Sequence, residues 1–310
     1  MIYHRMGQGD IRVSRIGLGT AQFGMDYGYH KALVQSEVDA VLEGCLRHGI
    51  NFIDTAREYG NAEERIGAFL RENPQNDFVI ATKISRILPT VADQKQRLKD
   101  WIKKSVDTSL QALSVDHIAV LQLHQCDEYV LNKQYFWESI EELKDQGLIA
   151  HFGVSIYEIA EAKRLIENYR QGLDMIQIPY NIFDQRFDAF LPQIAASGVE
   201  VMSRSVFLKG VIPVGNEKIP EEIKRIIPSK SKLNELAKKA SMSSEEYALL
   251  FSVLNRWICS TVIGICSVPE LELNMKVFEY LRKGTQWEAD MRTLAVEDEF
   301  LIDPRRWASI

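Results

Sequence analysis

Four side chains of this 310-residue sequence could together place a proton on a carbonyl oxygen. Asp54 and Tyr59 lie five residues apart in NFIDTAREYGNAEERIG (51–67), Lys83 ends VIATK, and His124 ends LQLH. An ammonium beside a phenol favours the phenolate, so Lys83 is expected to lower the pKa of Tyr59. A carboxylate would hold that ammonium in place, and a histidine can orient a carbonyl or relay a proton.

Such a group would protonate the oxygen while a hydride reaches the carbon. Amino-acid side chains supply no hydride, so the chemistry indicates a nicotinamide cofactor. Each of the four residues has a plainer explanation when taken alone, such as a helix cap, a surface charge or a satisfied core group. Their common position at the ends of apolar runs makes the chemical interpretation the stronger one.

The elements that must position these side chains alternate along the chain. Nearly continuous apolar runs are typical of parallel strands buried on both faces. Eight such runs occupy residues 15–20, 51–56, 78–84, 117–124, 151–156, 175–180, 199–205 and 260–265. Amphipathic segments between them predict helices, among them 36–49, 92–113, 135–147, 157–169, 188–198 and 269–284.

This alternation predicts an α/β fold, a (β/α)8 or TIM barrel, forming a single domain over residues 1–310. A doubly wound sheet is the runner-up, but GLGTAQFG lacks the GxGxxG spacing that such folds usually carry in the first turn. In a barrel, the active site lies at the C-terminal ends of the strands. Neighbouring strands lie about 4.8 Å apart, so Asp54, Tyr59, Lys83 and His124 are expected to converge.

Three segments fall outside the eight strand–helix units. The first 14 residues, with Gly7 and Gly9 between two extended runs, predict a hairpin that caps the lower end of the barrel. Residues 208–242 form an insertion that contains a basic helix, KSKLNELAKK. The tail from Gly284 onward is a candidate lid.

Composition narrows the class of partner. Hydrophobic residues make up 46% and charged residues 26% of the chain, with a net charge of -6 and no basic block, which disfavours nucleic acid as a partner. No apolar run approaches the ~20 residues that span a bilayer, and the N-terminus is too polar for a signal peptide. We therefore expect no membrane partner.

Cysteine usage bears on the compartment and on metals. Cys45, Cys126, Cys259 and Cys266 form no CxxC pair, which indicates reduced thiols and a cytoplasmic protein. HQCDE places His124 near Cys126 and Asp127, but consecutive ligands rarely converge on one ion. No metal is expected.

Several segments together resemble the aldo-keto reductase family over nearly the whole chain. They are GLGTAQFG, NFIDTAREYGNAEERIG, VIATK, LQLH, LKDQGLIAHFGVS and IQIPYN, in that order and with that family's spacing. The resemblance implies a (β/α)8 barrel that reduces carbonyl compounds with NAD(P)H. It also implies that Tyr59 is the general acid, Lys83 its partner, Asp54 the partner of Lys83, and His124 the group that orients the substrate.

The same resemblance implies a set of cofactor contacts. They are Gly19, Thr20, Asp54, Ser155, Gln177, Arg204, Ser205, Gly264, Cys266, Glu270 and Asn274. Ser155-Ile156 stands where the family usually has Ser-Asn, and Arg204 stands where it has an aromatic residue that stacks on the nicotinamide. The segment RSVFL is similar to a bacterial branch associated with deoxysugar and surface-polysaccharide pathways.

Two opposing arguments bear on whether the cofactor is NADPH or NADH. The family favours NADPH, whose 2′-phosphate is commonly gripped by basic residues. Here Gly264, Cys266 and Glu270 occupy those positions, which favours NADH, because an acidic residue can accept hydrogen bonds from ribose hydroxyls.

Three functions stay open at this point. The first is a reductase acting on an aldehyde or ketone, such as a sugar derivative, with Tyr59 as the acid. The second is a cofactor-binding barrel with a regulatory or sensor role and little turnover. The third is an isomerase or aldolase in which Lys83 forms a Schiff base. Neither the substrate nor the oligomeric state follows from the sequence.

Overall fold

Eight parallel strands close into a barrel in the computed structural model, which describes residues 1–7, 11–281 and 283–308. In order around the barrel, each strand hydrogen-bonded to the next, they are β10 (Ser260–Gly264), β3 (Ile16–Gly19), β4 (Phe52–Asp54), β5 (Val79–Ile84), β6 (Ile118–Leu123), β7 (Ile149–Ser155), β8 (Met175–Pro179) and β9 (Glu200–Arg204). The predicted (β/α)8 barrel is confirmed. Every predicted strand is present; seven are shorter than the apolar run that indicated them, and β7 begins two residues earlier than its run.

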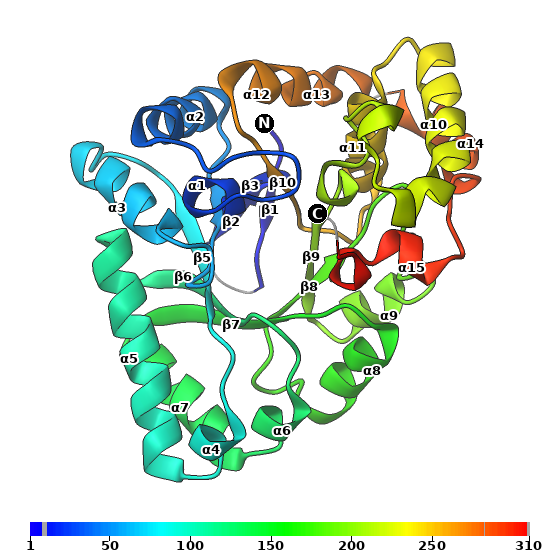
Figure 1. Cartoon of the computed structure of the whole chain (residues 1–310). Coiled ribbons are helices and arrows are strands. Elements are labelled where there is room, and N and C mark those ends of the chain that lie inside the picture. The colour runs from blue at the N-terminus through cyan, green and yellow to red at the C-terminus, as the bar shows by residue number, and fades with distance from the viewer. Residues whose placement is uncertain (8–10, 282, 309–310) are drawn as a thin grey trace.

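The helices form an outer layer around these strands (Figure 1). The longer ones are α2 (Gln35–His48), α3 (Ala62–Glu72), α5 (Lys95–Leu113), α7 (Gln134–Asp145), α8 (Ile159–Asn168), α10 (Ile227–Lys239), α11 (Ser244–Leu254) and α12 (Val268–Met275). The shorter ones are α1 (Ala21–Gly24), α4 (Pro89–Ala92), α6 (Glu128–Leu131), α9 (Leu191–Ala196), α13 (Val277–Tyr280), α14 (Glu288–Arg292) and α15 (Glu299–Ile302). Alternate strand residues such as Leu18 and Ile53 belong to the main core that these helices share with the strands.

A two-stranded hairpin covers one end of the barrel, as predicted. Its strands are β1 (Tyr3–Arg5) and β2 (Arg12–Ser14), paired antiparallel, and Gly9 between them lies outside the described residues. Met6 and Val13 are fully buried in a second apolar cluster that contains barrel-lining residues such as Phe52 and Met202. Because this cluster fills the end opposite the strand C-termini, the open end is the one where Asp54 and Lys83 lie.

Three helices differ from the sequence-based prediction. Helix α9 has six residues instead of the predicted 188–198, because Pro192 begins it and Gly198, at φ +82°, follows its last turn. The helix predicted over 269–284 is divided into α12 and α13. Helix α11 was not predicted, because buried residues surround it on every side instead of forming one stripe.

The insertion and the tail both contain short helical turns. Residues 208–242 include the 3-10 turns η1 (Leu208–Gly210), η2 (Asn216–Lys218) and η3 (Glu221–Ile226) before α10, which contains the predicted basic helix. The tail includes η4 (Gly284–Trp287), α14, α15 and η5 (Pro304–Arg306). It is anchored to the chain after β8, where Val296 N donates to Phe183 O at 2.9 Å.

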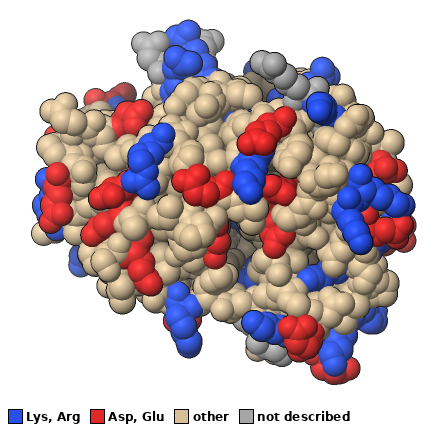
Figure 2. Space-filling model, turned by 90° about the horizontal axis from the view of Figure 1, so that it is seen from above, with Lys and Arg blue, Asp and Glu red and all other residues tan. Residues whose placement is uncertain are grey.

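Charge is mixed on the face seen in Figure 2, where Lys and Arg side chains alternate with Asp and Glu. The absence of a nucleic-acid partner stays a prediction. Within the described ranges, no helix combines the length and the apolar character required to cross a membrane.

Candidate active site

An ion pair lies at the open end of the barrel. Lys83 Nζ donates to Asp54 Oδ2 at 2.6 Å and to the carbonyl oxygen of Thr55 at 2.9 Å. The side chains of Lys83 and Asp54 are only 1% and 5% exposed. Both residues point inward because they are two positions from the inward-facing Ala81 and Phe52 on their strands.

Two glutamine amides complete the surroundings of Asp54. Gln177 Nε2 and Gln122 Nε2 donate to Asp54 Oδ1 at 2.9 and 3.1 Å. The Oε1 atom of each amide is buried and has no hydrogen-bond partner. Gln122 was missed in the sequence, although a polar residue between Leu121 and Leu123 in a buried strand is a signal that could have revealed it.

Tyr59 follows β4 and is fixed by close backbone packing. A Cβ atom at Gly60 would lie 2.1 Å from the Gly24 carbonyl oxygen, and one at Gly24 would lie 1.8 Å from the Tyr59 carbonyl oxygen. Gly60 also has φ +57°, which favours glycine. The turn after Tyr59 therefore requires glycine at both positions.

Tyr59 lies between Lys83 and His124. Lys83 Nζ is 5.2 Å from the centroid of the Tyr59 ring, and the His124 ring makes an edge contact with Tyr59 at 5.5 Å between centroids. His124 Nδ1 is 3.3 Å from Glu58 Oε2, but the geometry of this contact leaves Nδ1 without a hydrogen bond. The four predicted residues Asp54, Tyr59, Lys83 and His124 are thus brought together.

The ionisation of this group differs from the prediction in one respect. The pKa of Tyr59 is raised, first by burial and next by the Asp54 carboxylate, and the main cation that opposes this is Arg204. Burial and Asp54 therefore outweigh any lowering of the Tyr59 pKa by Lys83, and the effect of Lys83 itself stays a prediction. Burial also lowers the pKa of Lys83, against the opposing effect of Asp54.

The pKa of His124 is lowered to about 3. Burial is the largest cause, followed by the positive charges of Lys83 and Arg204. At neutral pH this imidazole is therefore uncharged, and the phenol of Tyr59 carries its proton.

All the predicted site residues line one cleft of about 590 Å³. Next to the ion pair lie Ser155, Gln177, Arg204 and Ser205, while Gly264, Cys266, Glu270 and Asn274 come from β10 and α12. Ser155 and Gln177 are register partners on β7 and β8, so their side chains are neighbours, and Gln177 Oε1 has no hydrogen-bond partner among the described residues. These two groups fit the donor and acceptor needs of a nicotinamide carboxamide.

Two further segments, outside the predicted set of cofactor contacts, also line this cleft. They are residues 27–30 after α1 and residues 206–218 after β9, including Lys209 and Lys218. The segments touch each other, since a Cβ atom at Gly28 would lie 2.5 Å from the Lys209 carbonyl oxygen. The sequence pattern does not show that these two loops meet.

Glu270 has a defined position at the start of α12. Its Oε2 accepts a hydrogen bond from the backbone N–H of Cys266 at 2.7 Å, and its own N–H donates to Ser267 Oγ at 3.3 Å. Within the part of the chain that the structure describes, the one group of three potential metal ligands is His30, Cys266 and Glu270. His124, Cys126 and Asp127 do not form such a group.

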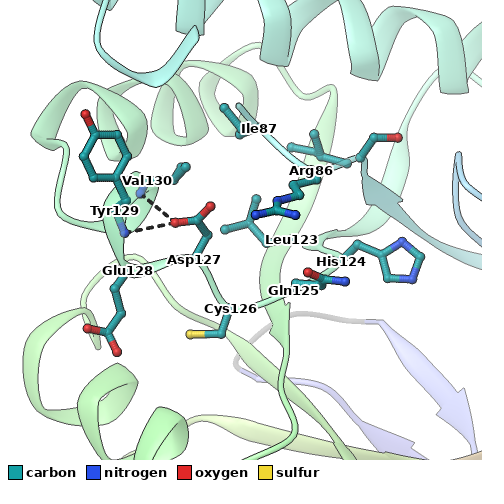
Figure 3. Close-up of a pocket in the computed structure, with 12 residues that line it drawn as sticks. Arg86, Ile87, Leu123, His124, Gln125, Cys126, Asp127, Glu128, Tyr129 and Val130 are labelled. Atoms are coloured by element: carbon teal, nitrogen blue, oxygen red, sulfur yellow. Dashed lines mark hydrogen bonds between the residues drawn. The ribbon is translucent and has the colours of Figure 1, made fainter. Parts of the chain in front are cut away.

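A second cavity, of about 430 Å³, lies between the loops that follow β5 and β6 (Figure 3). His124 and Gln125 line both this cavity and the main cleft. Arg86 enters from one loop, and Asp127 faces it from the other. Asp127 Oδ1 accepts from the backbone N–H groups of Tyr129 and Val130, which fixes the carboxylate in the cavity wall.

Arg204 stands at the end of β9 and lines the main cleft. Its guanidinium donates to the Ile156 carbonyl at 3.0 Å, to Ser205 Oγ at 3.2 Å and to Ser155 Oγ at 3.4 Å. It also lies over the ring of Tyr157, 4.1 Å from the centroid. These four contacts fix the position of the Arg204 guanidinium.

The fold and this site define a barrel with a buried lysine–aspartate pair beside a half-buried tyrosine and histidine. The model of the Aldo/keto reductase family matches residues 15–289, and the chain belongs to that family. It is a nicotinamide-dependent oxidoreductase that acts on carbonyl compounds.

Similar proteins come from plants and bacteria. L-galactose dehydrogenase of Arabidopsis thaliana is 26% identical, over 96% of this chain and 93% of its own. The NADH-specific methylglyoxal reductase of Escherichia coli is 27% identical, over 86% of this chain and 83% of its own. The structure of aldo-keto reductase AKR11C1 from Bacillus halodurans has a TM-score of 0.80 at 23% identity, over 99% of this chain and 100% of its own.

Proposed function

We propose that Tyr59 donates the proton in the reduction of an aldehyde or ketone to an alcohol. The observation that carries this proposal is the ionisation of the two candidate donors. His124, with a pKa of about 3, is not an imidazolium at neutral pH and so is a weak acid, whereas the raised pKa of Tyr59 keeps its phenol protonated. The neutral imidazole can still orient the carbonyl oxygen through a hydrogen bond.

Lys83 and Asp54 act on Tyr59 through charge and position. When the phenol gives up its proton, a negative charge develops on its oxygen. Lys83 Nζ, 5.2 Å from the ring centroid, favours that charge, and Asp54 keeps the ammonium in place at 2.6 Å. The bound cofactor supplies the hydride.

The cofactor is proposed to lie along the main cleft, with its carboxamide at Ser155 and Gln177. Gly19, Thr20, Ser205, Gly264, Cys266 and Asn274 would complete the contacts along the cleft. Family membership favours NADPH. The carboxylate of Glu270 on α12 favours NADH, because an acid repels a 2′-phosphate and accepts from ribose hydroxyls. We propose that NADH is used at least as well as NADPH.

The substrate is proposed to be a polar carbonyl compound such as a sugar or a sugar derivative. The second cavity supports this, since Arg86, Gln125 and Asp127 offer donors and acceptors next to His124 (Figure 3). Hydroxyl groups of the substrate can form hydrogen bonds with all three side chains.

A cytoplasmic location is also proposed. It is supported by the four cysteines, all of which are free thiols.

A panel of carbonyl compounds tests the proposal with both cofactors. Aldehydes of equal chain length, with and without hydroxyl groups, are compared by following the absorbance of the reduced nicotinamide. The proposal expects turnover with NADH and a higher kcat/KM for the hydroxylated member of each pair. Oxidation of one equivalent of bound cofactor without further turnover would instead favour the regulatory alternative.

A further inference from the structure

A residue in the C-terminal tail reaches the wall of the main cleft. We infer that Arg305 is a positioning residue that fixes Arg204 at the nicotinamide end of the cleft by clamping the ring of Tyr157 between them. This inference rests on the proposed function, because it assumes that the nicotinamide lies beside Arg204. It gives the tail a role in cofactor binding that is separate from the proton transfer.

The contacts with Tyr157 carry the argument. The guanidinium carbon of Arg305 is 3.6 Å from the centroid of the Tyr157 ring, and that of Arg204 is 4.1 Å from the same centroid. Two like charges at these distances on one face would repel and collide, so they occupy opposite faces. Each face of an aromatic ring carries negative potential that attracts a cation.

Arg305 is itself held firmly. It forms two hydrogen bonds with the carboxylate of Asp303, at 2.8 and 2.6 Å, and one with Glu158 at 3.0 Å. The side chain of Asp303 is only 1% exposed. Glu158 follows Tyr157 directly, so Arg305 contacts two consecutive side chains just after β7, the ring of Tyr157 and the carboxylate of Glu158.

Arg204 depends on this arrangement for its own position. Its contacts with the two serine hydroxyls are 3.4 and 3.2 Å, longer than usual for a charged donor. Only the bond to the Ile156 carbonyl, at 3.0 Å, has an ordinary length. The Tyr157 ring is therefore a main constraint on the plane of the guanidinium, and Arg305 determines where that ring lies.

The tail offers a matched control for the test. Arg306 is about as exposed as Arg305 and also faces Asp303, but it pairs with Glu299 instead of Glu158. Binding of NADH and of NAD+ to the full-length protein is measured by quenching of intrinsic fluorescence. We expect Arg305→Ala to weaken NADH binding about three- to tenfold, the range for a partly buried cation–π contact, and to change the NADH to NAD+ affinity ratio. Arg306→Ala should leave both constants unchanged.

Two changes at Tyr157 separate positioning from general stability. Tyr157→Phe keeps the aromatic faces and should bind like the wild type. Tyr157→Leu removes them and should match Arg305→Ala, and the double variant should be no worse than either single one. The comparison of Tyr157→Phe with Tyr157→Leu still tests the inference if Arg305→Ala fails to fold.

Unchanged affinities in Arg305→Ala, or losses equal to those in Arg306→Ala, would overturn the inference. Equal behaviour of Tyr157→Phe and Tyr157→Leu would overturn it as well. These readouts are binding constants, so an error in the role of Tyr59 would leave them unaffected and would appear only in turnover.

Discussion

Asp54 receives three side-chain hydrogen bonds, whereas Lys83, its partner at 2.6 Å, has the Thr55 carbonyl as its one further acceptor among the residues that the structure describes. Removing the two partners should therefore have unequal effects on stability. Asp54→Ala leaves a buried ammonium without a counter-charge, which costs about 3–5 kcal/mol of unfolding free energy. Lys83→Met leaves the carboxylate with two amide donors and should cost less. Urea unfolding at neutral pH measures both, and a larger loss in Lys83→Met would contradict this account of the pair.

Stability should depend on pH through His124. Its pKa of about 3 in the folded protein lies below the ordinary value of 6.5, so the unfolded chain binds the proton more readily. This contribution is complete above pH 6.5 and is lost as the pH falls towards 3. Between pH 7 and pH 5 the loss is about 2 kcal/mol. His124→Gln should show a correspondingly smaller decrease over the same interval, and parallel decreases in the two proteins would show that His124 is not the cause.

Choice of dinucleotide should respond to Glu270. Replacing a carboxylate near the 2′ position with a cation removes repulsion and adds attraction, so Glu270→Arg should shift the kcat/KM ratio towards NADPH about tenfold or more. Glu270→Gln keeps an acceptor for the Cys266 N–H and removes only the charge, so a smaller shift is expected. A wild-type preference for NADPH of about a hundredfold would show that Glu270 does not lie beside the ribose.

Arg204 should favour the reduced cofactor over the oxidised one. The oxidised ring is cationic and is repelled by a guanidinium, whereas the reduced ring is neutral and can stack on its plane. Arg204→Tyr should therefore tighten NAD+ relative to NADH in equilibrium titrations. Arg204→Lys serves as the control, because it keeps the charge and loses the plane. An unchanged ratio in Arg204→Tyr would indicate that Arg204 does not face the nicotinamide.

The barrel could be predicted because its strands are buried on both faces and appear as apolar runs. The same logic placed Asp54, Lys83 and His124 at one edge. Gln122 was missed, although a polar residue between Leu121 and Leu123 in a buried strand is the signal that could have revealed it. Contacts between distant segments, such as Tyr157 with Arg305, depend on how the tail folds back onto the barrel. No local sequence pattern predicts such a contact.

The ionisation of the site was also beyond sequence reasoning. A lysine beside a tyrosine lowers the pKa of the phenol when the charge is the main influence, but here burial outweighs it. Burial is a property of the assembled loops after β4, β5 and β6. The corrected picture is a protonated tyrosine and a neutral histidine, which makes the assignment of the proton donor testable.

The most direct test of that assignment is the rate of cofactor oxidation in a single turnover of Tyr59→Phe. The variant loses only the phenolic hydroxyl, and Tyr247→Phe is the matched control, since the Tyr247 hydroxyl is buried on α11 and makes no hydrogen bond. With cofactor bound at saturation and an aldehyde added, the account predicts a rate about 10²–10⁴-fold below wild type in Tyr59→Phe, with unchanged cofactor affinity. A rate above about a third of the wild-type value, where wild type and Tyr247→Phe agree, would contradict the proposal that Tyr59 is the proton donor.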